Sequence, residues 1–495
     1  MRHHLAIPTG LLAATALTAL AGCTVGPDFA PPQAPTARAY LAASERPAVS
    51  PVGAPAIVKG EGPQLRWWTA FASPELDALV DKALANNASL EASNATLAAA
   101  REQVAAVRGK QLPQIDANAR VEHEQVNLAA VGFKANPALG IEGNPEFNLY
   151  SAGAGVSFDL DPFGKLRRGT EQAAAQAEAQ LRQTEAAHLA VAGQVVNQVL
   201  TIAAIRDRIA TAQALLADDQ RNVELTRKRK QAGEGTLVEV LNAQSQYQND
   251  RGNLPQLDHQ LAEARHLLAT LVGIDPADLG PTDFALAQFR LPAAIPVTVP
   301  SQLVHKRPDI LQAEANLHAA TAAVGVATAN LYPDINLGAS LEQGATGLGS
   351  FLGNSARGFD IFGGLLAPIF HGGTLKAEKR AAVDRAQASA ATYRQTVLDA
   401  FRQVSNLLAA VDSDARSVGN RTEAQTVAQQ SLDLSRRSFQ VGNTGILQTL
   451  DAERQYQQAR YNLVEARARQ LTNLAQLYVA TAGGWTGVPA PAAGS

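Results

Sequence analysis

Most of the chain follows a helical pattern of apolar and polar residues, and much of its apolar content is alanine. Residues 73–110 show the pattern first, and Ser73 and Pro74 are residue types that favour a helix start. We expect one helix here, which ends before Pro113. Residues 166–231 contain no proline, so the sequence predicts a single helix that would span roughly 100 Å at about 1.5 Å per residue.

Two segments of the first half alternate between apolar and polar residues, which is the pattern of a strand with one apolar and one polar face. The first covers residues 115–122 and the second covers residues 150–160. A loop rich in Gly, Asn and Pro separates them, so we expect a β-hairpin over residues 113–162. Asp116 and Arg120 on the polar face suit a water-filled lumen; a half-exposed sheet on a soluble domain is the alternative.

The long predicted helix should end in a tight turn and be followed by a returning helix. The turn covers residues 232–236, and its glycines, Gly233 among them, permit a sharp reversal. Thr236 and Glu239 have the spacing of a capping box, which predicts the start of the returning helix. That helix continues to about Val272, and a proline-rich stretch follows.

The second half of the chain repeats the first, which is the most informative feature of the sequence. The segment from Gly233, GEGTLVEVLNAQSQYQNDRGNL, aligns without gaps with the segment from Gly442, GNTGILQTLDAERQYQQARYNL. A second β-hairpin is expected over residues 333–371, although mixed alternation in 359–370 makes its last strand the weakest of the four. The second turn is expected at residues 441–445.

Four strands per chain are too few to close a membrane barrel, because the smallest closed barrels have about eight. Open strand edges are not tolerated in lipid. Either the strands do not cross a membrane, or several chains share one barrel. Alanine-rich helix seams bury little area per residue, so helices of this length need neighbours along their whole length. The sequence therefore predicts that several protomers assemble side by side.

The only cysteine of the chain, Cys23, lies at the end of an apolar N-terminal segment. Residues 1–22 have the layout of a secretory signal peptide. Leu20-Ala21-Gly22-Cys23 resembles the lipobox of bacterial lipoproteins, in which the cysteine is acylated and becomes the first mature residue. Thr24 stands where retained lipoproteins have an aspartate, which favours the outer membrane. Residues 23–72 are therefore expected to be an acylated, extended N-terminal segment.

Composition argues against several classes of function. The chain has 42 Lys and Arg against 45 Asp and Glu, which gives no electrostatic reason to bind nucleic acid. None of the nine histidines forms a His-x₃-His pair, and no G-x-S-x-G elbow or P-loop is present. We therefore expect no enzyme activity, no metal site and no cofactor. After Leu20, no apolar run is long enough for a transmembrane helix.

Together, these patterns resemble the outer-membrane efflux proteins of the TolC type, in the lipoprotein branch of OprM and NodT. The matching residues are Leu20–Cys23 with Thr24–Phe29, Trp67-Trp68, Arg307–Ile310 with Ala313-Glu314, Leu331–Ile335, and the two turn segments. The resemblance covers nearly the whole mature chain. It implies a mixed, mainly α fold, in which long antiparallel helices form a trimeric periplasmic α-barrel. It also implies a shared outer-membrane β-barrel of 12 strands, four from each protomer.

The resemblance also implies partners and site residues. The partners are two further copies in a homotrimer, a periplasmic adaptor protein, an inner-membrane transporter of the RND type, and outer-membrane lipid. The turn residues expected to contact the adaptor are Gly233, Thr236, Gly442, Thr444 and Gly445. Leu450-Asp451-Ala452 matches the segment in which the family places an acid at the pore axis, so Asp451 is the candidate gate. The alternative is a solvated aspartate paired with Arg454 or Gln455.

We expect a signal peptide at 1–22, the acylated segment at 23–72, the two repeats at 73–300 and 301–485, and a flexible tail at 486–495. The expected function is a passive outer-membrane channel of a tripartite efflux pump, which conducts small molecules to the exterior. Two alternatives stay open, a secretion-system exit duct and a non-conducting coiled-coil lipoprotein. The strands of alternating polarity favour a channel, because a spacer has no need of them.

Overall fold

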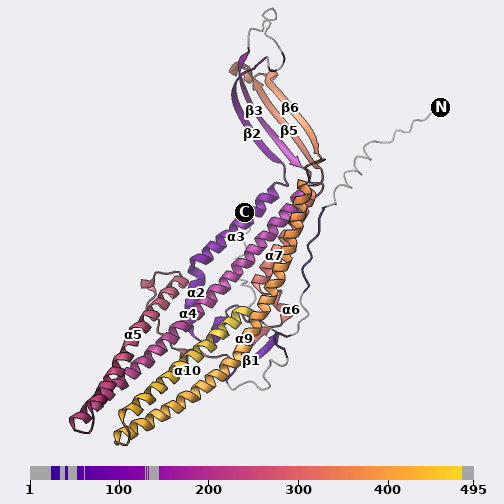
Figure 1. The fold of residues 1–495 in the computed structure, drawn as a ribbon. Coiled ribbons are helices and arrows are strands. Elements are labelled where there is room, and N and C mark those ends of the chain that lie inside the picture. The colour runs from indigo at the N-terminus through magenta and orange to yellow at the C-terminus, as the bar shows by residue number, and fades with distance from the viewer. Residues whose placement is uncertain are drawn as a thin grey trace, which may run out of the picture. The chain divides into compact units, whose positions relative to one another are not determined.

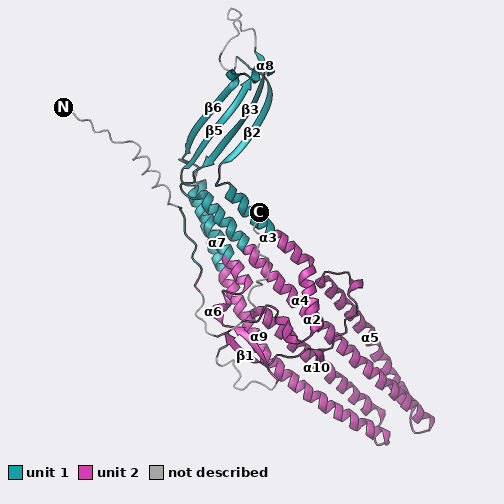
Figure 2. Ribbon diagram, turned by 180° about the vertical axis from the view of Figure 1, so that it is seen from behind, with its two compact units in different colours: residues 1–31, 98–178, 315–391 teal, residues 32–97, 179–314, 392–495 magenta. Residues whose placement is uncertain are grey.

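The structure is a computed structural model. It describes residues 24–33, 39–42, 53–60, 62–128, 130, 132 and 144–481. The predicted signal peptide, Cys23 and the predicted C-terminal tail lie outside these residues. The chain divides into two compact units (Figure 2). Unit 1 is Met1–Pro31, Ala98–Glu178 and Ala315–Ala391, and unit 2 is Pro32–Leu97, Ala179–Glu314 and Thr392–Ser495.

The two halves of the chain contain helices of equal length, which confirms the predicted repeat (Figure 1). The long helices are α4 (Lys165–Gln231) and α9 (Thr374–Gln440), with 67 residues each. The returning helices are α5 (Leu237–Val272) and α10 (Ile446–Thr481), with 36 residues each. Among the described residues, only α4 is long and apolar enough to cross a membrane by length and composition, and most of its apolar stretch is buried, as in a packed helix.

The single helix predicted over residues 73–110 is wrong, because Asn87 divides it. Helix α2 covers Pro74–Asn86 and helix α3 covers Ala88–Gly109. The Asn87 side-chain oxygen accepts hydrogen bonds from the backbone N–H groups of Ser89 and Leu90, at 3.0 and 3.3 Å. Asparagine competes with the helix backbone in this way, so it ends one helix and starts the next.

Unit 1 contains one antiparallel sheet in the order β2-β3-β5-β6. Its strands are β2 (Gln114–Gln125), β3 (Glu146–Asp159), β5 (Asp334–Ala345) and β6 (Arg357–Leu366). Both predicted hairpins are therefore present. Helix α7 (Pro308–Ala329), which matches α3 with 22 residues, precedes β5 and has its C-terminal part in this unit.

The register of the sheet explains the mixed alternation of the last strand. Ala339 pairs with Ile361 and Leu341 pairs with Phe359, so these residues share the apolar face. Phe362 and Leu366 are exceptions, because they pair with Gly338 and Asp334 on the polar face. A Cβ atom on Gly338 would lie 2.4 Å from the Phe362 ring, so the ring occupies space that only glycine leaves free.

Unit 2 contains α2, α5, α10 and a two-stranded sheet. Strand β1 (Ala56–Gly60) pairs in parallel with β4 (Ala294–Thr298). We did not predict this sheet, and residues 56–60 were expected to belong to the extended N-terminal segment. A parallel pair joins segments that are distant in sequence, so no local hairpin pattern predicts the pairing of β1 with β4.

The core of unit 2 explains two of the motifs quoted for the family. Trp67 and Trp68 are almost fully buried, and the Trp67 ring stacks on Tyr478 with 5.7 Å between ring centroids. The Arg307 guanidinium donates to the Gln403 side chain at 2.6 Å and to the Ala480 carbonyl at 3.1 Å. These motif residues hold α9 and α10 in place, which is a structural role.

Candidate functional site

The two turns lie where the sequence placed them, between Gln231 and Leu237 and between Gln440 and Ile446. Gly233 and Gly442 have positive φ angles of 80° and 82°, which glycine adopts without strain. At the first turn, Glu239 N–H donates to the Thr236 hydroxyl at 3.2 Å, and Thr236 N–H donates to the Glu239 carboxylate at 2.9 Å. The predicted capping box is therefore confirmed.

The second turn lacks this arrangement, because Gly445 occupies the place of Thr236 and has no side chain that could cap α10. The turn residues Gly233, Thr236, Gly442 and Gly445 are exposed, and Thr444 is half-buried. They are therefore accessible in the single chain, as a contact with another protein requires.

One side chain connects the ends of the two long helices. Arg229, in the last turn of α4, donates to the Phe439 carbonyl at 3.4 Å, and its guanidinium lies 4.6 Å from the centre of the Phe439 ring. The cation and the ring face attract each other, and a cation near a helix C-terminus is also favourable. This contact fixes the first turn beside the second.

Asp451 lies on α10 with about half of its side chain exposed. Its two carboxylate oxygens accept hydrogen bonds from Arg454 and from Gln455, the latter at 2.8 Å. In the single chain the carboxylate is thus held by its own helix, as the alternative reading expected. A pore requires several chains, so the gate role of Asp451 stays a prediction.

A buried acidic cluster joins the two helical hairpins of unit 2, and sequence reasoning missed it. Asp219 on α4 and Glu453 on α10 are 1% and 3% exposed. Glu453 accepts hydrogen bonds from Asn222 of α4 at 2.6 Å and from Arg436 of α9 at 2.9 Å. Arg436 also pairs with Asp218 of α4. One arginine thus holds carboxylates from both hairpins.

The cluster contains more carboxylates than cationic groups, and burial together with this excess of negative charge raises the pKa of Asp219. Burial and the neighbouring carboxylates of Asp250 and Glu453 raise the pKa of Asp219 to about 8, although Arg436 opposes the shift. Among the described residues, no N–H or hydroxyl donor reaches either Asp219 oxygen, and the group within hydrogen-bonding reach is the Asp250 carboxyl. Asp250 accepts a hydrogen bond from Gln246 at 2.6 Å. At neutral pH the cluster therefore holds a proton, which keeps two carboxylates from repelling each other.

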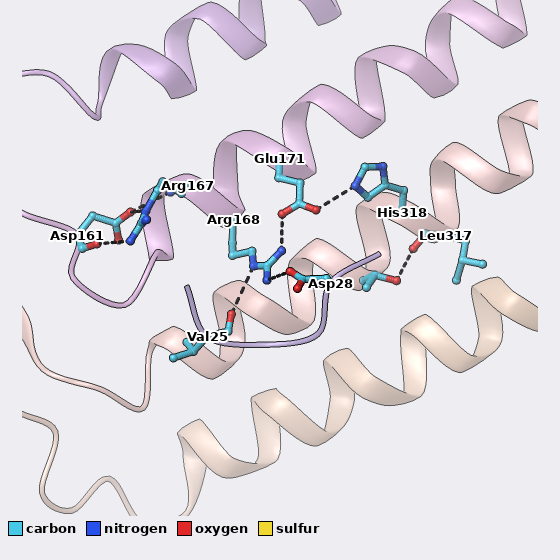
Figure 3. A network of polar contacts seen from close by, with 9 residues as sticks. Val25, Asp28, Asp161, Arg167, Arg168, Glu171, Leu317 and His318 are labelled. Atoms are coloured by element: carbon cyan, nitrogen blue, oxygen red, sulfur yellow. Dashed lines mark hydrogen bonds and ion pairs between the residues drawn. The ribbon is translucent and has the colours of Figure 1, made fainter. Parts of the chain in front are cut away.

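In unit 1, the residues that directly follow Cys23 lie against α4 and α7 (Figure 3). Arg168 of α4 donates to the Val25 carbonyl at 3.4 Å and to the Asp28 carboxylate at 2.6 Å. It also donates to Glu171 at 2.7 Å, and Glu171 contacts His318 of α7 at 2.9 Å. Residues 24–29 are therefore docked, whereas we expected a free extended segment.

Cys23 lies outside the described residues, so its acylation stays a prediction. Within the described ranges, no group of three or more His, Cys, Asp or Glu side chains is arranged to hold a metal ion.

A family model described as "Outer membrane efflux protein" matches residues 79–274 and 299–483. The chain is 30% identical over 476 residues to the pyoverdine export outer membrane protein OpmQ of Pseudomonas aeruginosa, covering 96% of each chain. It is 25% identical to the probable outer membrane lipoprotein SilC of Salmonella typhimurium, over 96% of this chain and 98% of SilC. Among solved structures, the open state of the MtrE outer membrane channel of Neisseria gonorrhoeae matches with a TM-score of 0.79 and 27% identity, over 94% and 99% of the two chains.

Proposed function

This chain belongs to the outer membrane efflux protein family, and from that membership we propose that it is the exit channel of a tripartite efflux pump. It is an efflux channel of the outer membrane, and its family is one of channel proteins rather than enzymes. The observation that carries the proposal is a sheet with one apolar and one polar face in the same chain as two helical hairpins.

The exposed apolar face of the sheet supports a position in lipid. Five of its side chains are 63 to 79% exposed in the single chain, namely Ile115, Val121, Leu341, Phe359 and Ile361, and Leu337 on the same face is 41% exposed. The sheet also has two edge strands, β2 and β6. Three copies that pair edge to edge give a closed barrel of 12 strands, with the apolar faces outward and the polar faces around a lumen.

The accessible turns support contact with a periplasmic adaptor protein. Such an adaptor requires an energised inner-membrane transporter, and the family resemblance implies one of the RND type. The name of OpmQ refers to the export of pyoverdine. We propose small molecules as the class of cargo for this channel. Asp451 is the proposed gate, since three copies would place three carboxylates around one aperture. Cys23 is the proposed site of acylation.

Conductance of the purified protein in planar bilayers tests the channel. We expect stepwise single-channel currents, because a closed barrel encloses a water-filled lumen. Purified protein that inserts into bilayers but carries no current would favour the non-conducting coiled-coil lipoprotein instead. Export of a folded protein, and of no small molecule, by cells that contain the channel would favour the secretion duct.

A further inference from the structure

The segment that directly follows the proposed anchor, Thr24–Phe29, occupies a built site in unit 1. We propose that α4 and α7 form a docking site for this segment, and that the site holds the acylated cysteine at the end of strand β3. The second part of this proposal rests on the proposed acylation of Cys23. The partner is therefore a segment of the same chain, recognised by its backbone, its glycine and its acid.

The site first binds the backbone of Val25. The Val25 N–H donates to the Phe163 carbonyl at 3.1 Å, and the Val25 carbonyl accepts from Arg168. Both backbone groups of this residue are thus satisfied, as in a strand ladder. The Phe163 ring stacks on Tyr332 with 4.7 Å between ring centroids, which holds the acceptor in place.

Two close approaches in the site require glycine. Gly26 has a φ of 96°, and a Cβ atom on it would lie 2.5 Å from the Cα atom of Gly325 on α7. Gly164 has a φ of 80°, and a Cβ atom there would lie 2.6 Å from the Thr24 side chain. Any side chain at Gly26 or Gly164 would therefore push the segment away.

Charge and stacking complete the recognition. The Arg168 side chain is only 6% exposed, and it pairs with Asp28 from the segment and with Glu171 from its own helix. The His318 ring stacks on Phe29 at 4.3 Å with 13° between the planes. Burial raises the pKa of Glu171, but the hydrogen bonds from Arg168 and His318 outweigh burial and hold the pKa below its usual value. The Arg168–Glu171 pair lies within α4 and includes no residue of the segment.

The docking site lies close to the end of the sheet, and its position therefore restricts where the lipid anchor can lie. Gly164 lies between the end of β3 at Asp159 and the start of α4 at Lys165, so Thr24 is held at the end of the sheet. A free coil of about 40 residues would let an anchor move over roughly 30–40 Å. Consecutive Cα atoms are about 3.8 Å apart, so a docked Thr24 keeps the acylated residue beside the strand.

Mobility of a spin label tests the docking. Cys23 is the only cysteine, and acylation blocks its thiol, so Ala30→Cys gives one reactive thiol next to the docked segment. The nitroxide-labelled, full-length protein is measured in phospholipid vesicles by electron paramagnetic resonance. Three variants are compared in this background: Gly26→Val, Arg168→Ala and Arg167→Ala. Arg167 is the matched control, because it contacts Asp161 and not the segment.

We expect restricted motion in the parent and in Arg167→Ala, and at least threefold faster label motion in Gly26→Val and Arg168→Ala. Gly26→Val changes the segment and leaves the helices intact, so it decides the matter if Arg168→Ala fails to fold. Equally restricted motion in parent and Gly26→Val would overturn the docking site. Palmitate labelling of the parent and of the Cys23→Ser variant is a separate readout. If the parent takes up no palmitate, the protein is not acylated. If the Cys23→Ser variant still takes up palmitate, Cys23 is not the acylated residue.

Discussion

Asp219 is a carboxyl group whose surroundings oppose its charge, so its protonation is coupled to folding. An unfolded chain holds this proton only below the ordinary aspartate pKa of 3.8, whereas the folded chain holds it up to a pH of about 8. Between these values the folded state binds more protons than the unfolded state. The free energy of unfolding should therefore fall as the pH rises through this window and stay level above it.

Asp219→Asn removes the titrating group and keeps the shape of the side chain. We expect a higher melting temperature than that of the parent at pH 8.5, by several degrees, and a much smaller difference at pH 5. The measurement is thermal unfolding at a series of pH values. Asp258→Asn, an exposed aspartate on α5, is the control and should show no such trend. A difference between Asp219→Asn and parent that does not change with pH would contradict the shared-proton interpretation.

Asp451→Ala tests the proposed gate. In the proposed trimer, three carboxylates around a narrow aperture would favour cations, and the closed spacing would depend on the hydrogen bonds that these carboxylates make. We expect a larger single-channel conductance, a lower cation selectivity and greater leakage of large antibiotics into cells. Asn242→Ala is the matched control, because Asn242 is the counterpart of Asp451 in the first repeat. Conductance and selectivity equal to the parent, in a variant that still assembles, would exclude Asp451 as a gate residue.

Candidate site residues could be identified from the sequence where they lie within one short sequence motif. Cys23, the turn glycines and Asp451 could be identified in this way, although the roles of Cys23 and Asp451 stay predictions. The acidic cluster could not be identified, because its members come from four helices and 231 positions separate Asn222 from Glu453. The docking of residues 24–29 was missed for the same reason, since Arg168 and His318 lie far away in sequence.

At the scale of elements, helix starts differ between the repeats in a way that can be measured. The capping box of Thr236 satisfies two N–H groups at the start of α5, and Thr236→Ala should cost this helix end about 1 kcal/mol. Gly445→Thr would supply α10 with the same motif, because Gln448 stands at the third helical position. Its added Cβ atom would meet Gln448 at an ordinary contact distance of 3.5 Å.

Hydrogen exchange of the first-turn amides measures both changes. We expect faster exchange at the start of α5 in Thr236→Ala, about fivefold for about 1 kcal/mol. We expect slower exchange at the start of α10 in Gly445→Thr, by about twofold, because replacing glycine at a cap gains only a few tenths of a kcal/mol. Unchanged exchange in Thr236→Ala would mean that packing, and not the cap, holds the end of α5.

The long helices and their turns were predicted to within about a residue, because proline-free runs and glycine turns are local signals. The break at Asn87 and the β1–β4 sheet were not predicted. Asn87 also donates from its side-chain amide to the Leu271 carbonyl at 2.8 Å, and β1 depends on a strand more than 200 positions away. Both features depend on tertiary partners that no sequence window contains.

At the scale of the whole molecule, the sheet predicts the oligomeric state. Strands β2 and β6 end the sheet on either side, and an open edge in lipid leaves backbone groups unpaired. The mass in detergent should be about three times that of the mature protomer, whose full-length chain of 51.9 kDa is shortened by removal of the predicted signal peptide. A stable, folded monomer in detergent would contradict the shared barrel, since its apolar strands would retain two open edges.

The equal lengths of α4 and α9, and of α5 and α10, restrict how this protein can change in evolution. Arg229 fixes the first turn beside the second, so a seven-residue insertion in α4 alone would displace that turn by about 10 Å from its neighbour. The connections within the β-hairpins are free of this restriction, and they already differ, with residues 126–145 in one and 346–356 in the other. A natural change in the length of the two helical hairpins, α4–α5 and α9–α10, therefore requires two coordinated insertions or deletions, one in each half of the gene.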